Sequence, residues 1–147
     1  MHKIIESCLS NEPENGDLAA KYGELAARLF SQMVPALDKI NMIRALETGL
    51  YSKRLGIAGT VDCVAEYEGK LSIIDFKTAR RKWDEVNENY LVQATFYSIA
   101  WEERTKEKGG QIAILTTTET GECYVHKDYP SKYIRRLDEM IADAKPK

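Results

Sequence analysis

Two aspartates and a lysine near the middle of the chain have the types and spacing of a hydrolytic site. Asp62 lies in the segment GTVDC at residues 59–63, and Asp75 and Lys77 lie in IIDFKT at residues 73–78. Carboxylate oxygens suit hard divalent ions such as Mg²⁺ and Mn²⁺. A lysine beside such an ion can hold the attacking water or stabilise charge that develops on phosphorus. Two acids and a lysine in an apolar frame therefore indicate hydrolysis of phosphodiesters.

The segment between the two aspartates predicts how they meet. Residues 57–67 and 71–78 have the composition of strands, and Glu68-Gly69 between them can form a two-residue hairpin turn. Tyr67 then pairs with Lys70, and the same register places Asp62 opposite Asp75 with Cβ atoms about 5 Å apart. Lys77, two residues further on, points to the same face. Two opposed carboxylates repel each other, and a divalent cation would compensate.

A simpler explanation competes with this one, because short motifs of the D…DxK kind arise often by chance. One aspartate would then be solvated at a strand end, and Lys77 would form a plain salt bridge with Asp75 or Asp62. The strand-turn-strand context favours the metal site over this alternative.

Periodicity and turn residues predict the elements that position this hairpin. A short helix is expected over residues 2–9, and a helix from Leu18 to about Met33 with Asp17 as its N-cap, broken by Pro35 before a second short helix to about Ile40. The remaining elements are a strand at 41–51, a helix at about 90–106 ended by Gly109-Gly110, a hairpin of 111–118 and 122–127, and a helix from Ser131, its cap, to about Ala144.

The order α, α, β, β, β, α, β, β, α predicts an α/β (α+β) fold with a central mixed sheet flanked by helices. A length of 147 residues fits a single domain over 1–147. The net charge of −2 excludes a whole-protein basic field of the kind that coats duplex DNA nonspecifically. Three scattered cysteines have no zinc spacing. Without a long apolar segment, we expect a cytoplasmic protein of a bacterial or phage-infected host cell.

Residues 59–79, GTVDCVAEYEGKLSIIDFKTA, resemble the two active-site strands of PD-(D/E)XK nucleases in the RecB-like branch. The segment is especially similar to the mitochondrial genome maintenance exonucleases and their phage relatives. The resemblance implies a restriction-endonuclease-like core in which Asp62 and Asp75 bind metal and Lys77 is catalytic. It also implies the backbone carbonyl of Phe76 as a further metal ligand.

Three outlying pieces fit the same resemblance. His2 and Glu6 match an HxxxE helix whose histidine is a metal ligand, although a histidine near a terminus can equally be solvated. Gln93 and Tyr97 match a QxxxY helix that supports the site or touches DNA, and both could be ordinary helix residues. Glu47 could match the acid before the GxxD strand. In the branch, further residues precede the HxxxE helix, so a minimal form and a missing N-terminal segment both stay open.

Contacts with DNA are expected from the residues that follow the DxK strand. Thr78 is counted with the supporting residues, and Arg80, Arg81 and Lys82 could hold phosphates that flank the scissile bond. Trp83 and Tyr90 could stack on unpaired bases. A solvated charge cluster and aromatics packed in the fold are the alternatives.

The sequence therefore predicts a Mg²⁺- or Mn²⁺-dependent deoxyribonuclease, an exonuclease on single-stranded or frayed ends that acts in repair or recombination beside recombination or replication proteins. One alternative is a non-catalytic DNA-binding module with the same fold, which the intact Asp62, Asp75 and Lys77 disfavour. Another is a restriction-like endonuclease, which the lack of a recognisable target-recognition segment disfavours.

Overall fold

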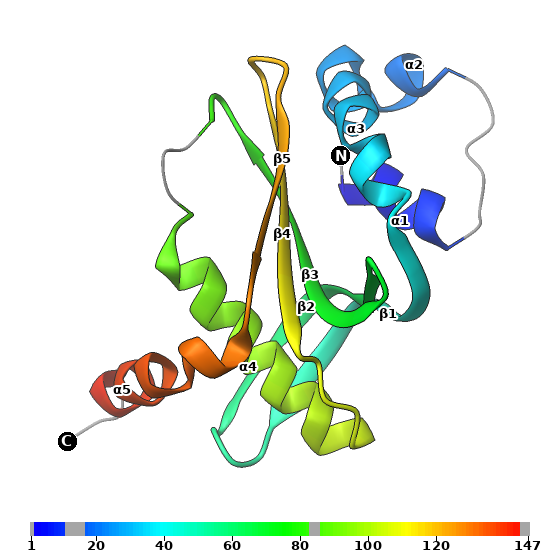
Figure 1. The fold of residues 1–147 in the computed structure, drawn as a ribbon. Helices are drawn as coiled ribbons and strands as arrows, with labels where there is room; N and C mark the ends of the chain where they lie inside the picture. The colour runs from blue at the N-terminus through cyan, green and yellow to red at the C-terminus, as the bar shows by residue number, and fades with distance from the viewer. Residues whose placement is uncertain (1, 11–16, 83–85, 145–147) are drawn as a thin grey trace.

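A five-stranded sheet forms the centre of the molecule, with the strands in the order β1-β2-β3-β4-β5. The computed structural model describes residues 2–10, 17–82 and 86–144 (Figure 1). Strands β3 and β4 are parallel, and every other neighbouring pair is antiparallel. The strands are β1 Ile40–Ser52, β2 Ile57–Tyr67, β3 Lys70–Ala79, β4 Gln111–Thr118 and β5 Cys123–Asp128. This is the mixed sheet that the sequence predicts.

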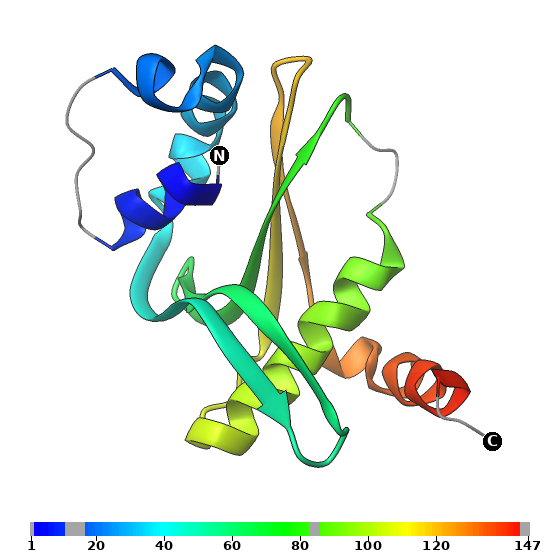
Figure 2. The same cartoon turned by 180° about the vertical axis from the view of Figure 1, so that it is seen from behind.

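Helices cover the sheet from two sides. The first three helices lie together on one side, and the last two lie on the other (Figures 1 and 2). No helix in the described ranges is long and apolar enough to cross a membrane. The helices are α1 His2–Leu9, α2 Leu18–Tyr22, α3 Glu24–Leu37, α4 Glu88–Thr105 and α5 Ile134–Ala144, and a 3₁₀ helix at Pro130–Lys132 precedes α5.

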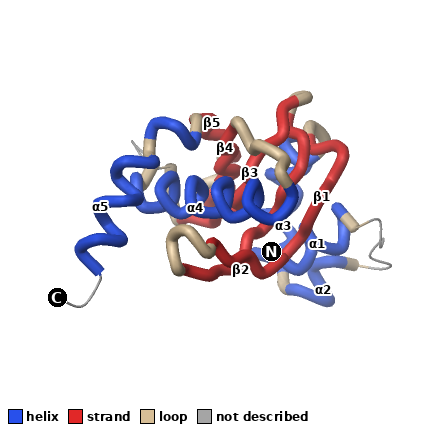
Figure 3. Tube along the Cα trace, turned by 90° about the horizontal axis from the view of Figure 1, so that it is seen from below, coloured by secondary structure: helices blue, strands red, loops and turns tan. Residues whose placement is uncertain are grey.

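Alternation along the strands builds a core on each face of the sheet. On β3, Ile73 packs with residues of α4, whereas Ile74 packs with residues of α1 and α3. All eight residues of β4 are buried, as expected for a strand that is covered on both faces. Seen from below, α4 runs across the sheet (Figure 3). The two cores hold α1 and α4 against opposite faces of β3, which carries the candidate site residues Asp75, Phe76, Lys77 and Thr78.

Most predicted elements are present, and the errors concern where helices break and end. Gly23, with a φ of +95°, separates α2 from α3, so the single helix expected from Leu18 is wrong. Pro35 lies inside α3 and does not break it. Helix α4 ends on Lys106 in the left-handed conformation rather than at Gly109-Gly110. Ser131 lies in the 3₁₀ helix and does not cap α5.

A buried carboxylate ties the end of β5 to the start of α5. Asp128 accepts hydrogen bonds from the Tyr133 hydroxyl and the Tyr129 N–H, and Lys132 and His126 lie within 3.3 Å of its carboxylate. Burial alone would raise the pKa of Asp128, but these donors outweigh burial and hold the pKa at about 2. The ionised form of Asp128 therefore stabilises the junction that places α5.

Replacing this carboxylate tests the anchor. Asp128→Asn should lower the free energy of unfolding at pH 7 by about 1–3 kcal/mol, because buried donors lose a charged acceptor. The pKa of Asp128 falls from its ordinary 3.8 to about 2 on folding. The contribution of ionised Asp128 to the free energy of unfolding is therefore complete above pH 3.8 and is lost as the pH falls towards 2. Urea unfolding of both proteins should give a stability gap that closes over this range, and a gap that stays constant would contradict the assignment.

Candidate active site

The β2–β3 hairpin has the register that the sequence predicts. Tyr67 pairs with Lys70, and the pairing continues to Cys63 with Ile74. Both turn residues have positive φ, +52° at Glu68 and +82° at Gly69, as a tight hairpin turn of this kind requires. The predicted turn is thereby confirmed, and the predicted register is confirmed as far as Cys63 and Ile74, one pair short of Asp62 and Asp75.

The two strands part immediately beyond the last pair, where Asp62 and Asp75 lie. From there β2 pairs only with β1, through Val61 and Thr48, while β3 pairs with β4, through Asp75 and Ile114. The divergence of β2 and β3 is visible in Figure 2. We call this opening the fork. It leaves room around the two carboxyl groups that a continuous ladder would not leave.

The carboxyl groups of Asp62 and Asp75 lie close enough across the fork to shift each other's pKa. Each side chain is only 17% exposed. Burial, and then the hydrogen bond and negative charge of Asp62, raise the pKa of Asp75 to about 7. Burial also acts on Asp62, but hydrogen bonds from His2, Asp75 and the Phe76 N–H hold its pKa at about 2. The site therefore holds one negative charge firmly and accepts a second one only with compensation.

Lys77 lies beside this pair. Its Nζ is 3.1 Å from Oδ2 of Asp75 and 4.2 Å from the ring centroid of Tyr90. The first contact is a charge-assisted hydrogen bond, and the second is a cation–π interaction. The Lys77–Asp75 salt bridge that a chance motif would also give is thus present. The nuclease hypothesis places the lysine at the same position. Tyr90 lies two helical turns before Tyr97, a spacing that could have indicated a second aromatic facing the site.

His2 reaches the site from the α1 face of the sheet, opposite the α4 face on which Lys77 contacts Tyr90. Its Nε2 is 2.7 Å from the carbonyl oxygen of Phe76 and 3.5 Å from Oδ2 of Asp62. The hydrogen bond with Asp62 raises the pKa of His2 against the effect of burial. Helix α1 is held in place by Ile4 and Ile5, each 1% exposed. Glu6, the second residue of the HxxxE motif, forms an ion pair with Lys3, with 4.0 Å between Oε2 and Nζ.

Glu47 adds a third acid from β1. It lies between the paired positions Leu46–Cys63 and Thr48–Val61, and so across from Asp62. Its φ of +43° is costly for a residue with a side chain and is typical of functional sites. Burial and the charge of Asp62 raise its pKa, and the charge of His2 lowers it.

The two residues of the QxxxY motif differ in their distance from the acids. Tyr97 is 8% exposed, and burial followed by the charges of Asp75, Asp62 and Glu47 raises its pKa. Gln93 is exposed and lines a groove next to Tyr97. Tyr97 therefore adjoins the acidic site, and Gln93 lies at its edge.

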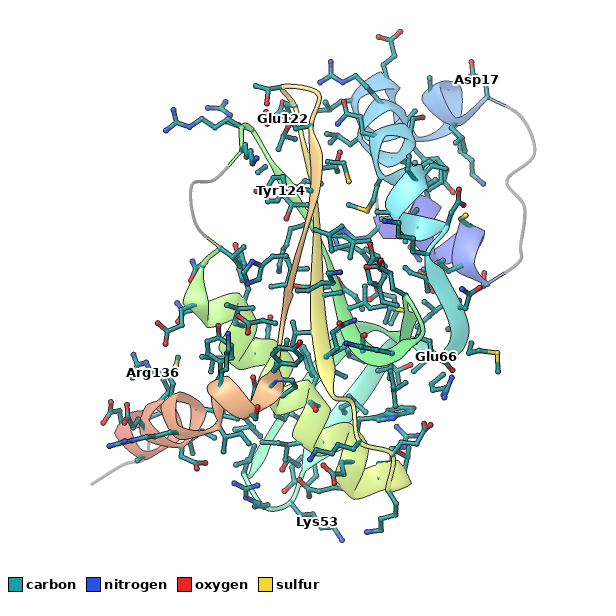
Figure 4. All side chains as sticks on the ribbon, viewed as in Figure 1. Asp17, Lys53, Glu66, Glu122, Tyr124 and Arg136 are labelled. Atoms are coloured by element: carbon teal, nitrogen blue, oxygen red, sulfur yellow. The ribbon has the colours of Figure 1, made fainter. Side chains whose placement is uncertain are left out.

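The basic residues that follow β3 are not brought to the acids. Thr78 pairs with Thr117 near the end of β3, and Arg80, Arg81 and Lys82 lie exposed beyond the strand. Five extended residues span roughly 16 Å, which separates Arg80 from Asp75. Lys82 lies 5.7 Å from the ring of Tyr124 (labelled in Figure 4). Trp83 is outside the described residues.

The donor set at the fork suits a hard divalent ion. It combines two carboxylates, a backbone carbonyl and an imidazole nitrogen, contributed by Asp62, Asp75, Phe76 and His2. These groups contact one another in pairs, and within the described ranges no three His, Cys, Asp or Glu side chains are arranged as a ready-made metal cage. Burial and the nearby Asp62 raise the pKa of Asp75, so an added cation would favour its ionised form.

Comparisons with known proteins point to one family. The profile of the PD-(D/E)XK nuclease superfamily matches residues 2–145. The Mitochondrial genome maintenance exonuclease 1 of Homo sapiens is 34% identical over 80 residues, and that of Mus musculus is 34% identical over 82 residues. Each match covers 54% of this chain and 23% of the relative, so this chain spans about a quarter of the curated relatives it matches.

A solved structure from Eubacterium rectale, described as a candidate exonuclease, has the same fold. It aligns with 97% of this chain at a TM-score of 0.57, and the alignment covers 62% of that protein. The sequence identity is 15%, so the likeness concerns the fold alone.

A glycine fixes how closely α4 approaches the site. A Cβ on Gly59 would lie 3.1 Å from Cε1 of Tyr97 and 3.3 Å from Cε2 of Phe96. Gly59→Ala should therefore lower the free energy of unfolding by about 1 kcal/mol or more, because both rings are packed and must shift. Gly49→Ala on β1 is the matched control, since no atom lies within 4 Å of its added Cβ. Equal effects of the two changes in urea unfolding would contradict this close packing.

Proposed function

Since the chain belongs to the PD-(D/E)XK nuclease superfamily, we propose that it hydrolyses phosphodiester bonds in DNA with the aid of Mg²⁺ or Mn²⁺. The observation that carries this proposal is the juxtaposition of Asp62, Asp75 and Lys77 at the fork. The two carboxyl groups shift each other's pKa there, and the lysine Nζ lies 3.1 Å from one of them. A purely structural role would not account for two mostly buried carboxyl groups held together at the point where strands separate.

The metal ligands in this proposal are Asp62, Asp75, the Phe76 carbonyl and His2. Bound there, a divalent ion would supply a water of lowered pKa and would neutralise charge on a phosphoryl oxygen. The protein's part is to hold the donors in place. The Phe76 N–H fixes one oxygen of Asp62 at 2.9 Å, and α1 holds the imidazole against the Phe76 carbonyl. Glu47, across from Asp62, is proposed as a further acid of the same site.

Lys77 is the proposed catalytic lysine. Its ammonium group can donate a hydrogen bond to the attacking water or to a phosphoryl oxygen as charge develops. Asp75 and the ring of Tyr90 hold Nζ from different directions, which limits the rotamers that the side chain can adopt. Tyr97 and Gln93 border the site from α4 and are proposed to support it or to contact DNA.

We propose an exonuclease that acts on single-stranded or frayed ends. The support is the name of the curated relatives, which are exonucleases, and the resemblance that residues 59–79 bear to the active-site strands of such enzymes. Arg80, Arg81 and Lys82 would contact the strand well away from the scissile bond, because they lie beyond the end of β3. Phosphates some distance along the strand are the groups that these side chains could hold.

One cleavage assay tests both the chemistry and the mode. With Mn²⁺, wild-type protein should shorten linear end-labelled single-stranded DNA and leave a circle of the same sequence intact, and EDTA should stop the reaction. Lys77→Ala should lower kcat by at least 100-fold, because the loss of one stabilising donor typically costs about that much. Its affinity for DNA should stay within a few-fold of the wild type.

Lys70→Ala is the matched control, since it removes an exposed lysine from the first position of the same strand. It should cleave like the wild type. Full activity of Lys77→Ala would remove the proposed mechanism. Cutting of the circle by the wild type would replace the exonuclease mode with an endonuclease.

A further inference from the structure

A groove of about 510 Å³ runs beside the acidic site on the α4 face of the sheet. Its walls are residues 55–59 at the start of β2, one side of α4 and one side of α5. The volume lies in the range of small-molecule sites. The junction at Asp128 places α5, and so one wall of the groove, against the rest of the fold.

The chemistry of the lining suits an uncharged, flat group. No described residue that lines the groove carries a charge, and most of the lining is aliphatic or aromatic, with Met140 and Ile141 partly buried along α5. Asn89 and Gln93 are exposed and bring two side-chain amides to the lining. Amides pair with the donor and acceptor edges of nucleobases, and apolar walls take their faces.

The groove adjoins the strand that carries Asp62. Gly59 and Tyr97 both line the groove, and Gly59 precedes Asp62 by three residues on β2. Gln93 lines the groove one helical turn before Tyr97. Three extended residues span about 10 Å, so a DNA strand with a phosphate at the acids could extend a nearby base to this opening.

Basic residues lie at the outer edge of the same region. Lys53 lies at the tip of the β1–β2 hairpin and Arg136 lies on α5 (Figure 4). Arg54 forms an ion pair with Asp138 at 3.7 Å, which links the hairpin to α5 across the groove. The rim carries both signs, since Arg136 also pairs with Glu88 and Glu139, and the neutral interior matches the base of a nucleotide.

We propose that this groove holds one unpaired nucleobase of the DNA strand whose phosphate lies at the acidic site. The proposal rests on the proposed function, which supplies both the DNA strand and the position of its phosphate. It makes the groove a base-binding subsite that selects an unpaired strand, because a base in a duplex cannot leave its partner without cost.

The test compares two single strands of equal length and charge, a thymidine strand and a fully abasic strand. Binding is measured by fluorescence anisotropy in EDTA, so that no cleavage takes place. The wild type should prefer the thymidine strand by roughly 5- to 100-fold, because each stacked base contributes about 1–3 kcal/mol. Asn89→Asp and Met140→Glu should each reduce this preference several-fold, since either places a carboxylate in the groove.

Ala142→Glu is the matched control, because it adds the same charge to an exposed position of α5 that does not line the groove. It should keep the wild-type preference. Asn89 is exposed in the first turn of α4, where an acid is favourable, so its variant should fold even if the Met140 variant does not.

Two results would overturn the proposal. The first is a wild type that binds both strands equally. The second is an Asn89→Asp variant whose preference for the thymidine strand equals that of the Ala142→Glu control. That result would point to a protein segment as the occupant of the groove. Binding is measured without metal and without cleavage. If the wild type fails to cleave DNA, the comparison of the thymidine and abasic strands can therefore still be interpreted.

Discussion

The repulsion between two carboxyl groups is the constraint around which the site is built. Asp62 and Asp75 are brought together by a hairpin register that has no freedom once the turn at Glu68-Gly69 is formed. Both are mostly buried, so solvent screens their charges poorly. A proton on Asp75, the ammonium group of Lys77 and the imidazole of His2 are the positive charges that the chain itself can offer. A divalent ion is a stronger compensation, and this is why the acids are proposed as its ligands.

The rest of the fold delivers partners to that pair from both faces of the sheet. Helix α1 positions His2, and the buried side chains of Ile4 and Ile5 hold this helix in place. Helix α4 positions Tyr90 and Tyr97 on the opposite face of the sheet. Strand β1 brings Glu47, with a backbone in the left-handed region. Such a conformation costs about 1–3 kcal/mol, which the pairing of β1 with β2 on either side must offset. The hairpin alone would hold the acids, but it would not supply these neighbours.

Features that depend on residues close together in the sequence could be predicted better than features that depend on distant residues. The turn at Glu68-Gly69 is local, so the facing of Asp62 and Asp75 follows from counting residues. Helix ends depend on weaker signals. Gly23 divides a helix whose apolar spacing continues across it, and Pro35 is tolerated inside α3. Lys106 adopts the left-handed conformation that glycine would adopt more easily, so the glycines three residues later are a misleading sign.

Contacts between distant segments could not be predicted from spacing, and only the family resemblance placed His2 and Phe76 at one site. The bond between His2 and the Phe76 carbonyl spans 74 residues and depends on how α1 docks. The basic residues after Thr78 lie exposed beyond β3, and their contacts with phosphates that flank the scissile bond stay a prediction. The groove has no sequence motif, because its walls come from β2, α4 and α5 and exist only after these have packed.

Binding of Mn²⁺ tests the central claim most directly. In crystals soaked with Mn²⁺, an anomalous peak should lie between the carboxylates of Asp62 and Asp75, and calorimetric binding should be lost in Asp75→Asn. The absence of a peak at the fork, or unchanged Mn²⁺ affinity in that variant, would show that the two acids are held together for some reason other than a metal.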